Sequence, residues 1–170
     1  RQSSAFDGKA FEADPDNRLL WRMSKRRIEA ESMRDAMLKV SGELDLRRPA
    51  GSLVGRVIGD RPVSLVGLDK RLPPDLDGSV HRSIYLPVLR DRLPDVLDVF
   101  DFASPSLVTG QRESTNVPTQ ALYLMNGDFV NRRANAMAAK LRNETASDRE
   151  FLRRAFRCCY GRLPTAAEAQ

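Results

Sequence analysis

Apolar side chains recur at three- and four-residue steps along the first quarter of the chain, from Pro15 to Leu44. This spacing places them on one helical face and predicts a single long helix over these residues, with Asp14–Asn17 as turn and N-cap. The predicted inward positions are Leu20, Met23, Ala30, Met33, Met37, Val40 and Leu44, with Arg27 as the one exception on that face.

The pattern is lost in the middle of the chain, where glycines and prolines interrupt every short apolar run. We predict an irregular excursion or insertion over residues 45–83, with a short strand at Val63–Val66. The alternation of Ile84, Leu86 and Val88 then predicts a strand over Arg82–Val88. Pro87 makes it an edge strand, because proline cannot donate a ladder hydrogen bond.

Proline suits the first turn of a helix, and two prolines of the second half precede helical patterns. Pro94 predicts a short helix through Phe100, with Val96, Leu97 and Phe100 inward. Pro118 predicts a helix that ends near Asn126.

Two longer helices are predicted after this point. One runs from Asp128 to about Arg142, and the other begins at a capping box formed by Ser147 and Glu150 and ends at Gly161. We expect both to pack against the N-terminal helix, so that Leu20, Met33 and Met37 meet Met137, Leu141, Phe151 and Phe156. The predicted fold is mainly α: an irregular helical bundle with a small β element and a long Gly/Pro-rich excursion, forming one domain over residues 1–170.

The composition is typical of a folded domain and indicates which environments and partners are compatible with it. The chain has 170 residues, 41% of them hydrophobic and 30% charged, which suffices for a core and a solvated surface. It begins without an initiator methionine or a leader, so we expect a fragment of a longer protein. No apolar run reaches the roughly 18 residues of a transmembrane helix. The net charge of +5 permits an anionic partner without selecting one.

Chemical motifs are scarce, and we predict no catalytic residue, metal site or cofactor for this chain. His81 is the only histidine, which disfavours a histidine-rich metal site and leaves only Ser83 or Ser114 as nucleophile partners on paper. Cys158 and Cys159 are adjacent, against ordinary disulfide geometry. The Cys-x-x-Cys-His haem motif and the Gly-rich phosphate loop are both missing.

Two sets of polar residues remain as candidates. A basic helical face with one aromatic ring, together with a later arginine, predicts contact with phosphate or sulfate groups; its members are Trp21, Arg22, Lys25, Arg26, Arg27 and Arg112. The second set is predicted to cap helices and not to react; its members are Thr115, Asn116, Gln120, Ser147 and Glu150.

The order of several short motifs resembles a known family. These motifs are Asn17–Arg22, Glu29–Ala36, Arg82–Val88, Phe100–Phe102, Thr115–Leu122, Asn126 with Phe129 and Val130, and Gly161–Thr165 with Glu168. The chain resembles the C-terminal domain-of-unknown-function family of large planctomycete proteins, which often begin with a planctomycete-type cytochrome c domain. The resemblance covers almost the whole chain, least well around Gly51–Gly78. It implies an exported, extracytoplasmic protein whose gene neighbours act on polysaccharides, and it carries no catalytic residues.

We therefore expect a non-catalytic accessory or interaction module of a large exported protein, linked to polysaccharide utilisation or to a haem domain elsewhere in the full chain. Its expected partners are other domains of the same protein and anionic polysaccharide. One alternative is a hydrolase that acts on anionic polysaccharide through Arg112 and the acids Asp95, Asp98 and Asp101. Nucleic-acid binding through Trp21–Arg27 is the third choice.

Overall fold

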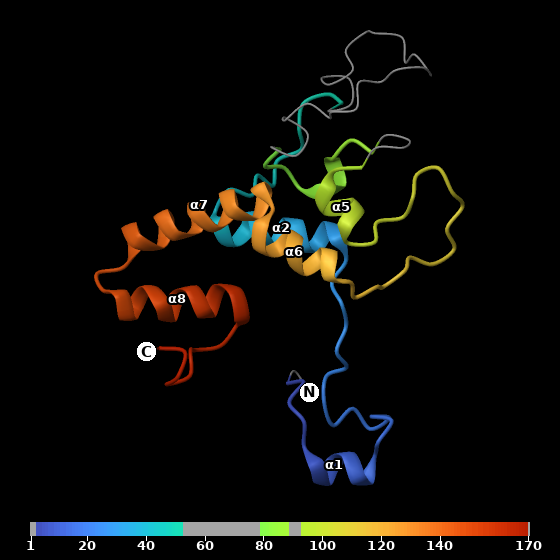
Figure 1. Ribbon diagram of the computed structural model, residues 1–170, viewed down its shortest axis with the longest axis vertical. Coiled ribbons are helices and arrows are strands. Elements are labelled where there is room, and N and C mark those ends of the chain that lie inside the picture. The colour runs from blue at the N-terminus through green and yellow to red at the C-terminus, as the bar shows by residue number, and fades with distance from the viewer. Residues whose placement is uncertain (1–2, 53–78, 89–92, 170) are drawn as a thin grey trace.

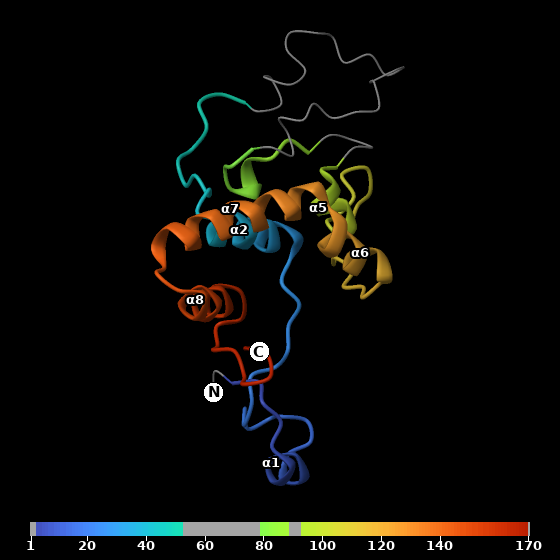
Figure 2. The ribbon, with the colours of Figure 1, turned by 60° about the vertical axis from the view of Figure 1, so that its left-hand side comes forward.

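The part of the chain that the computed structural model describes, residues 3–52, 79–88 and 93–169, is helical, as predicted (Figure 1). Its elements are α1 (Gly8–Ala13), α2 (Ala30–Ser41), the 3-10 turn η1 (Ser83–Tyr85), α5 (Asp95–Val99), α6 (Pro118–Asn126), α7 (Asp128–Glu144) and α8 (Asp148–Tyr160). Helices α2, α5, α6 and α7 form the central body, and α1 lies apart from it in both views (Figure 1, Figure 2). Within the described ranges, the β structure is limited to one isolated parallel bridge between Asp45 and His81.

The helix predicted from Pro15 to Leu44 is wrong over its first half, because α2 begins only at Ala30. The Asp14 carboxylate accepts hydrogen bonds from the backbone N–H groups four and five residues later, at 2.9 and 2.8 Å. The Asn17 side chain bonds both the N–H and the carbonyl of the residue five positions on. Such bonds compete with helical backbone bonds. Leu20, 66% exposed, adds no packing to favour the helix.

The buried face of α2 is rotated by one residue from the predicted stripe. Its buried side chains are Ala30, Arg34, Leu38 and Ser41. Met33 and Met37 lie half-buried beside this face. Gly42 ends the helix in the left-handed region, at φ 82°, so α2 stops before the predicted end at Leu44.

The hydrophobic core lies where the start of α2 meets α5, α6 and the segment after η1. Its buried members are Ala30, Leu86, Val96, Leu97 and Phe100. Tyr123 of α6 packs edge-on against Phe100, with ring centroids 5.9 Å apart. The helices predicted after Pro94 and from Pro118 are thus confirmed, including the inward face of the first.

The strand predicted over Arg82–Val88 is wrong, because its central residues form η1. The N–H and the hydroxyl of Ser83 both donate to Asp35 of α2, at 2.7 Å each. These bonds fold the backbone onto α2 and leave Ile84 72% exposed. The strand predicted at Val63–Val66 lies outside the described residues.

The two C-terminal helices are confirmed with nearly the predicted bounds. Gly127 separates α6 from α7, and a Cβ at this position would lie 2.6 Å from the Tyr123 carbonyl oxygen. α8 begins after Ser147, whose hydroxyl accepts from the Glu150 N–H at 3.3 Å. It ends at Gly161, with φ 67°.

Helix α7 links the N-terminal and C-terminal helices α2 and α8. It contacts both α2 and α8, and its buried side chains are Phe129, Met137 and Leu141. The predicted packing of the N-terminal helix on residues 128–144 is therefore confirmed. Two parts of that prediction are wrong. Helix α8 packs on α7 rather than on α2. Leu20 lies exposed in the non-helical segment before α2.

Candidate functional site

Arg112 fastens the irregular 100–117 segment to the start of α2. Its two terminal nitrogens each donate to one oxygen of the Glu31 carboxylate at 2.8 Å, in the bidentate geometry that suits guanidinium groups. A weaker contact joins Arg112 to Glu29 at 3.4 Å. The guanidinium also lies 4.7 Å from the ring centroid of Phe102.

The electrostatics of this pair favour the charged state of both partners. Burial by itself would raise the pKa of Glu31, but the hydrogen bonds from Arg112 outweigh it and leave this pKa below its ordinary value. The hydrogen bond from Glu31 in turn raises the pKa of Arg112. Both partners are therefore charged around neutral pH.

Asp101 organises the second polar cluster of the same region. Its carboxylate accepts from both the N–H and the hydroxyl of Thr115, at 2.9 and 2.8 Å. Arg27 places a guanidinium nitrogen 3.1 Å from the same carboxylate. Burial would raise the pKa of Asp101, yet the bonds from Thr115 and the charge of Arg27 hold it below its ordinary value. Asp101 has a φ of 61°, in the left-handed region that non-glycine residues rarely adopt. The surrounding hydrogen bonds hold the backbone in this conformation.

Gln120, buried in the first turn of α6, completes this cluster. Its amide nitrogen donates to the Thr115 hydroxyl at 3.2 Å and to the Val99 carbonyl at 3.1 Å. Its amide oxygen accepts from the Val117 N–H at 3.2 Å. Gln120 therefore reaches back over the start of α6, and the same side chain also ties α6 to the end of α5.

The other predicted caps differ in what they contact. Thr115 forms hydrogen bonds with Asp101 and Gln120. The N-cap residue of α6 is Val117 and not Thr115. Asn116 is exposed and forms no hydrogen bond within the described ranges.

A cavity of about 460 Å³ lies between these two clusters. Arg27 and Arg112 both line it, together with Asp101, Glu29 and Glu113. Two members of the predicted anion-binding set, far apart in sequence, thus share one cavity. Both guanidinium groups already face carboxylates, so an anion entering here would compete with acids that are part of the fold.

The remaining members of that set lie elsewhere. Trp21 donates from its ring nitrogen to the Asp14 carbonyl at 2.8 Å, and Arg22 stacks on Trp21 at 4.7 Å from the ring centroid. Lys25 and Arg26 are exposed on the segment before α2. Since this segment is not helical, the basic helical face predicted over Trp21–Arg27 does not form.

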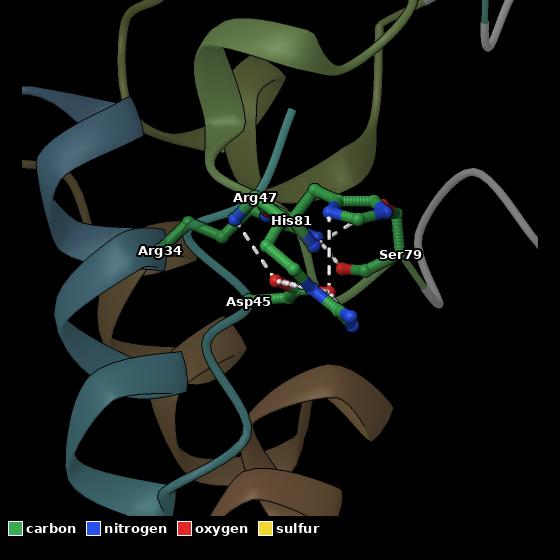
Figure 3. A network of polar contacts seen from close by, with 5 residues as sticks. All are labelled: Arg34, Asp45, Arg47, Ser79 and His81. Atoms are coloured by element: carbon green, nitrogen blue, oxygen red, sulfur yellow. Dashed lines mark hydrogen bonds and ion pairs between the residues drawn. The ribbon is translucent and has the colours of Figure 1, made fainter. Parts of the chain in front are cut away.

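A third polar cluster surrounds Arg34, which is fully buried in α2 (Figure 3). Its guanidinium donates to the His81 carbonyl at 3.0 Å, to the Ser83 hydroxyl at 3.3 Å and to the Ser79 carbonyl. It also lies 5.2 Å from the ring centroid of Phe129 on α7. One side chain thereby links α2, α7 and residues 79–83.

Asp45 and His81 lie next to each other beside this cluster and are joined by the isolated bridge (Figure 3). The Asp45 N–H donates to the carbonyl before His81 at 2.8 Å, and the His81 ring nitrogen Nδ1 lies 3.8 Å from the Asp45 carboxylate. Arg47 donates to both oxygens of that carboxylate. This bond from Arg47 is the main cause that lowers the pKa of Asp45 far below its ordinary value. His81 therefore belongs to a contact that joins the segment after α2 to the segment before η1.

The arrangement offers no pair suited to nucleophilic catalysis among the described residues. The Ser83 hydroxyl donates to Asp35 and not to His81, and Ser114 lines the 460 Å³ cavity on the exposed 110–117 segment. No group of three or more potential ligands in the described residues is arranged to hold a metal ion. Likewise, none of the described helices has the length and apolar character needed to span a bilayer.

One family model, PSD1, described as a protein of unknown function (DUF1553), matches residues 1–170. The chain belongs to the DUF1553 family. No curated protein and no solved structure matches this DUF1553 chain. The match confirms the resemblance as far as a family of unknown function. The planctomycete and cytochrome c associations stay predictions.

Sequence reasoning missed Arg34 and the role of Asp101. Arg34 lies four residues after Ala30 and four before Leu38, so its spacing marked it as a member of the buried face. Asp101 stands between two phenylalanines, a position where a carboxylate is unusual unless it is bonded. Their partners, by contrast, could not be identified from sequence spacing.

Proposed function

We propose that this domain is a non-catalytic interaction module of a larger exported protein, and that its partner is another domain of the same protein. The observation that supports this most directly is that α6 has one side anchored to the fold and one exposed apolar side. On one side, the buried Gln120 forms hydrogen bonds with Val99 and Thr115. On the other side, apolar side chains are exposed to solvent.

The exposed side of α6 is continuous. Its members are Val117, Ala121, Leu122, Leu124 and Met125. At 100° per residue they span an arc of roughly 160°, opposite Gln120 and Tyr123. Met125 is 72% exposed and Leu122 is 56% exposed. A contiguous exposed apolar surface of this kind is typical of a protein-binding site.

The polar clusters support the non-catalytic part of the proposal. Arg112, Asp101 and Thr115 are the groups best suited to chemistry in the 100–120 region, and each is bonded to another part of the fold. These bonds tie the 100–117 segment to α2 and, through Thr115 and Gln120, to α6. Export and association with a haem domain or with polysaccharide use are supported by the family resemblance alone.

The experiment compares the domain with the remainder of its full-length protein, expressed separately. We expect the two to associate, and we expect Leu122→Asp with Met125→Asp to abolish association while thermal stability is retained, because both side chains are exposed. Lys25→Asp, a charge change on another exposed segment, serves as the control. Equal binding by the wild type and the α6 variant would refute the placement of the interface.

A hydrolase acting on anionic polysaccharide is the second candidate, and the 460 Å³ cavity is the observation that favours it. Arg27 and Arg112 line it beside the acids Asp101, Glu29 and Glu113, whereas Asp95 and Asp98 lie exposed on α5. Release of new reducing ends from sulfated or uronic-acid polysaccharides would support this candidate. That activity would have to disappear in Asp101→Asn at a temperature where the variant is folded.

A further inference from the structure

A second cavity, of about 720 Å³, lies between the first half of α8 and the segment that follows the helix. The chain turns back after Gly161, so residues 163–169 run alongside α8 (Figure 1). Leu152, Leu163 and Pro164 supply an apolar wall. Arg149 and Arg153 also line the cavity and give it a positive side.

These two arginines belong to a row on α8. Arg149, Arg153 and Arg157 are spaced four residues apart, which places them on one helical face. All three are exposed, and in the described part of the chain none of them forms an ion pair. Neighbouring arginines behave differently: Arg154 contacts Glu144 at 3.1 Å, and Arg162 contacts Glu168 at 2.8 Å.

The stability of α8 does not explain this row. Like charges four residues apart repel each other on a helix. Arg149 stands in the first turn, where the helix dipole disfavours a cation. Ser147 and Asp148 already supply the cap and the negative charge that favour this end of the helix. A ligand with negative charge would offset both effects.

The cavity also indicates what else the ligand contains. Guanidinium pairs match the oxygens of a sulfate, phosphate or carboxylate group. An apolar wall beside them binds a hydrocarbon chain or ring. The Asp148 carboxylate lines the same cavity and disfavours a second acid group. We propose that this cavity binds a small amphiphilic anion, with its acid group between Arg149 and Arg153 and its apolar part against Leu152, Leu163 and Pro164.

Calorimetric titration with octyl sulfate, below its micelle concentration, tests the site. Inorganic sulfate and 1-octanol serve as the two halves of the probe, and we expect octyl sulfate to bind more tightly than either. Arg149→Gln and Arg153→Gln should each raise the Kd about tenfold, as expected for the loss of one charge-assisted hydrogen bond. Arg157→Gln, on the same row but outside the cavity lining, is the matched control and should leave the Kd within about twofold.

These outcomes distinguish binding in the cavity from nonspecific electrostatic or hydrophobic binding. Equal affinity for octyl sulfate and octanol would overturn the proposal, as would an Arg157→Gln effect equal to that of Arg149→Gln. Vesicles of phosphatidylglycerol and phosphatidylcholine form the last arm. Binding to anionic vesicles without binding of soluble octyl sulfate would assign the row to a membrane surface and overturn the cavity. None of these results depends on the α6 surface.

Discussion

Arg34 offers the sharpest test of how this fold is held together. It is fully buried, and its guanidinium donates to oxygens on residues 79–83, more than forty positions away in sequence. The change is Arg34→Met, which keeps much of the side-chain volume and removes the charge and all the donors. The same contact to Phe129 is available to a methionine, so the loss is mainly polar.

The expected magnitude follows from two opposing effects. A hydrogen bond from a charged group contributes about 1.5–3 kcal/mol, and Arg34 makes contacts to three oxygens. Removing a buried charge also removes its desolvation cost, which offsets part of that sum. We therefore expect the free energy of unfolding to fall by about 3 kcal/mol. For a chain of this size, about 2–4 °C per kcal/mol predicts a melting temperature lower by roughly 6–12 °C.

The assay is thermal and urea unfolding followed by circular dichroism at 222 nm. Lys39→Met, at an exposed position of the same helix, is the matched control and should change stability by less than about 0.5 kcal/mol. Arg34→Lys should be intermediate, since an ammonium group keeps the charge but lacks the fork of donors. If Arg34→Met were as stable as the control, the link between α2 and residues 79–83 would not contribute to folding.

Three further predictions follow from the other clusters. The lowered pKa of Asp101 means that its contacts stabilise the fold above its unfolded-state pKa of about 3.9 and lose this effect as the pH falls towards the folded value. Asp101→Asn should thus lower the melting temperature at pH 7, with a smaller difference from wild type at pH 3; a constant difference would argue against it. Thr115→Ala should cost about 1–2 kcal/mol through its bonds to Asp101, whereas Asn116→Ala should stay within about 0.5 kcal/mol in the same urea titration. Leu97→Ala, in the fully buried core, should cost about 2–5 kcal/mol and exceed Met37→Ala, which changes a half-buried side chain; the reverse order would misplace the core.

Local signals were reliable where the residues that decide the structure are neighbours in sequence. The prolines before α5 and in α6, the Ser147 cap and the terminal Gly161 all act within one helical turn. Each of these boundaries was predicted to within a residue or two. The inward face of α5 was also predicted correctly, because its apolar spacing has only one helical arrangement.

The same spacing was misleading between residues 15 and 29. Leu20 and Met23 continue the helical period, but Asp14 and Asn17 hold the backbone in turns through their side chains. Periodicity registers only apolar positions, so it could not weigh these polar bonds against the helix. The rotated face of α2 has a related cause: the apolar period selected Met33 and Met37 as inward and gave no weight to Arg34, which is buried.

The sequence by itself therefore determined a helical protein, the bounds of its later helices and the absence of recognisable catalytic motifs. Only the tertiary structure decided that Arg34 is buried, that Arg27 and Arg112 share a cavity, and that Thr115 bonds Asp101 rather than a helix end. The physical reason is the range of the interactions. Caps and turns depend on atoms a few residues apart, whereas Arg34 and Arg112 find their partners 45 to 83 residues away, and such pairs exist only once the helices have packed.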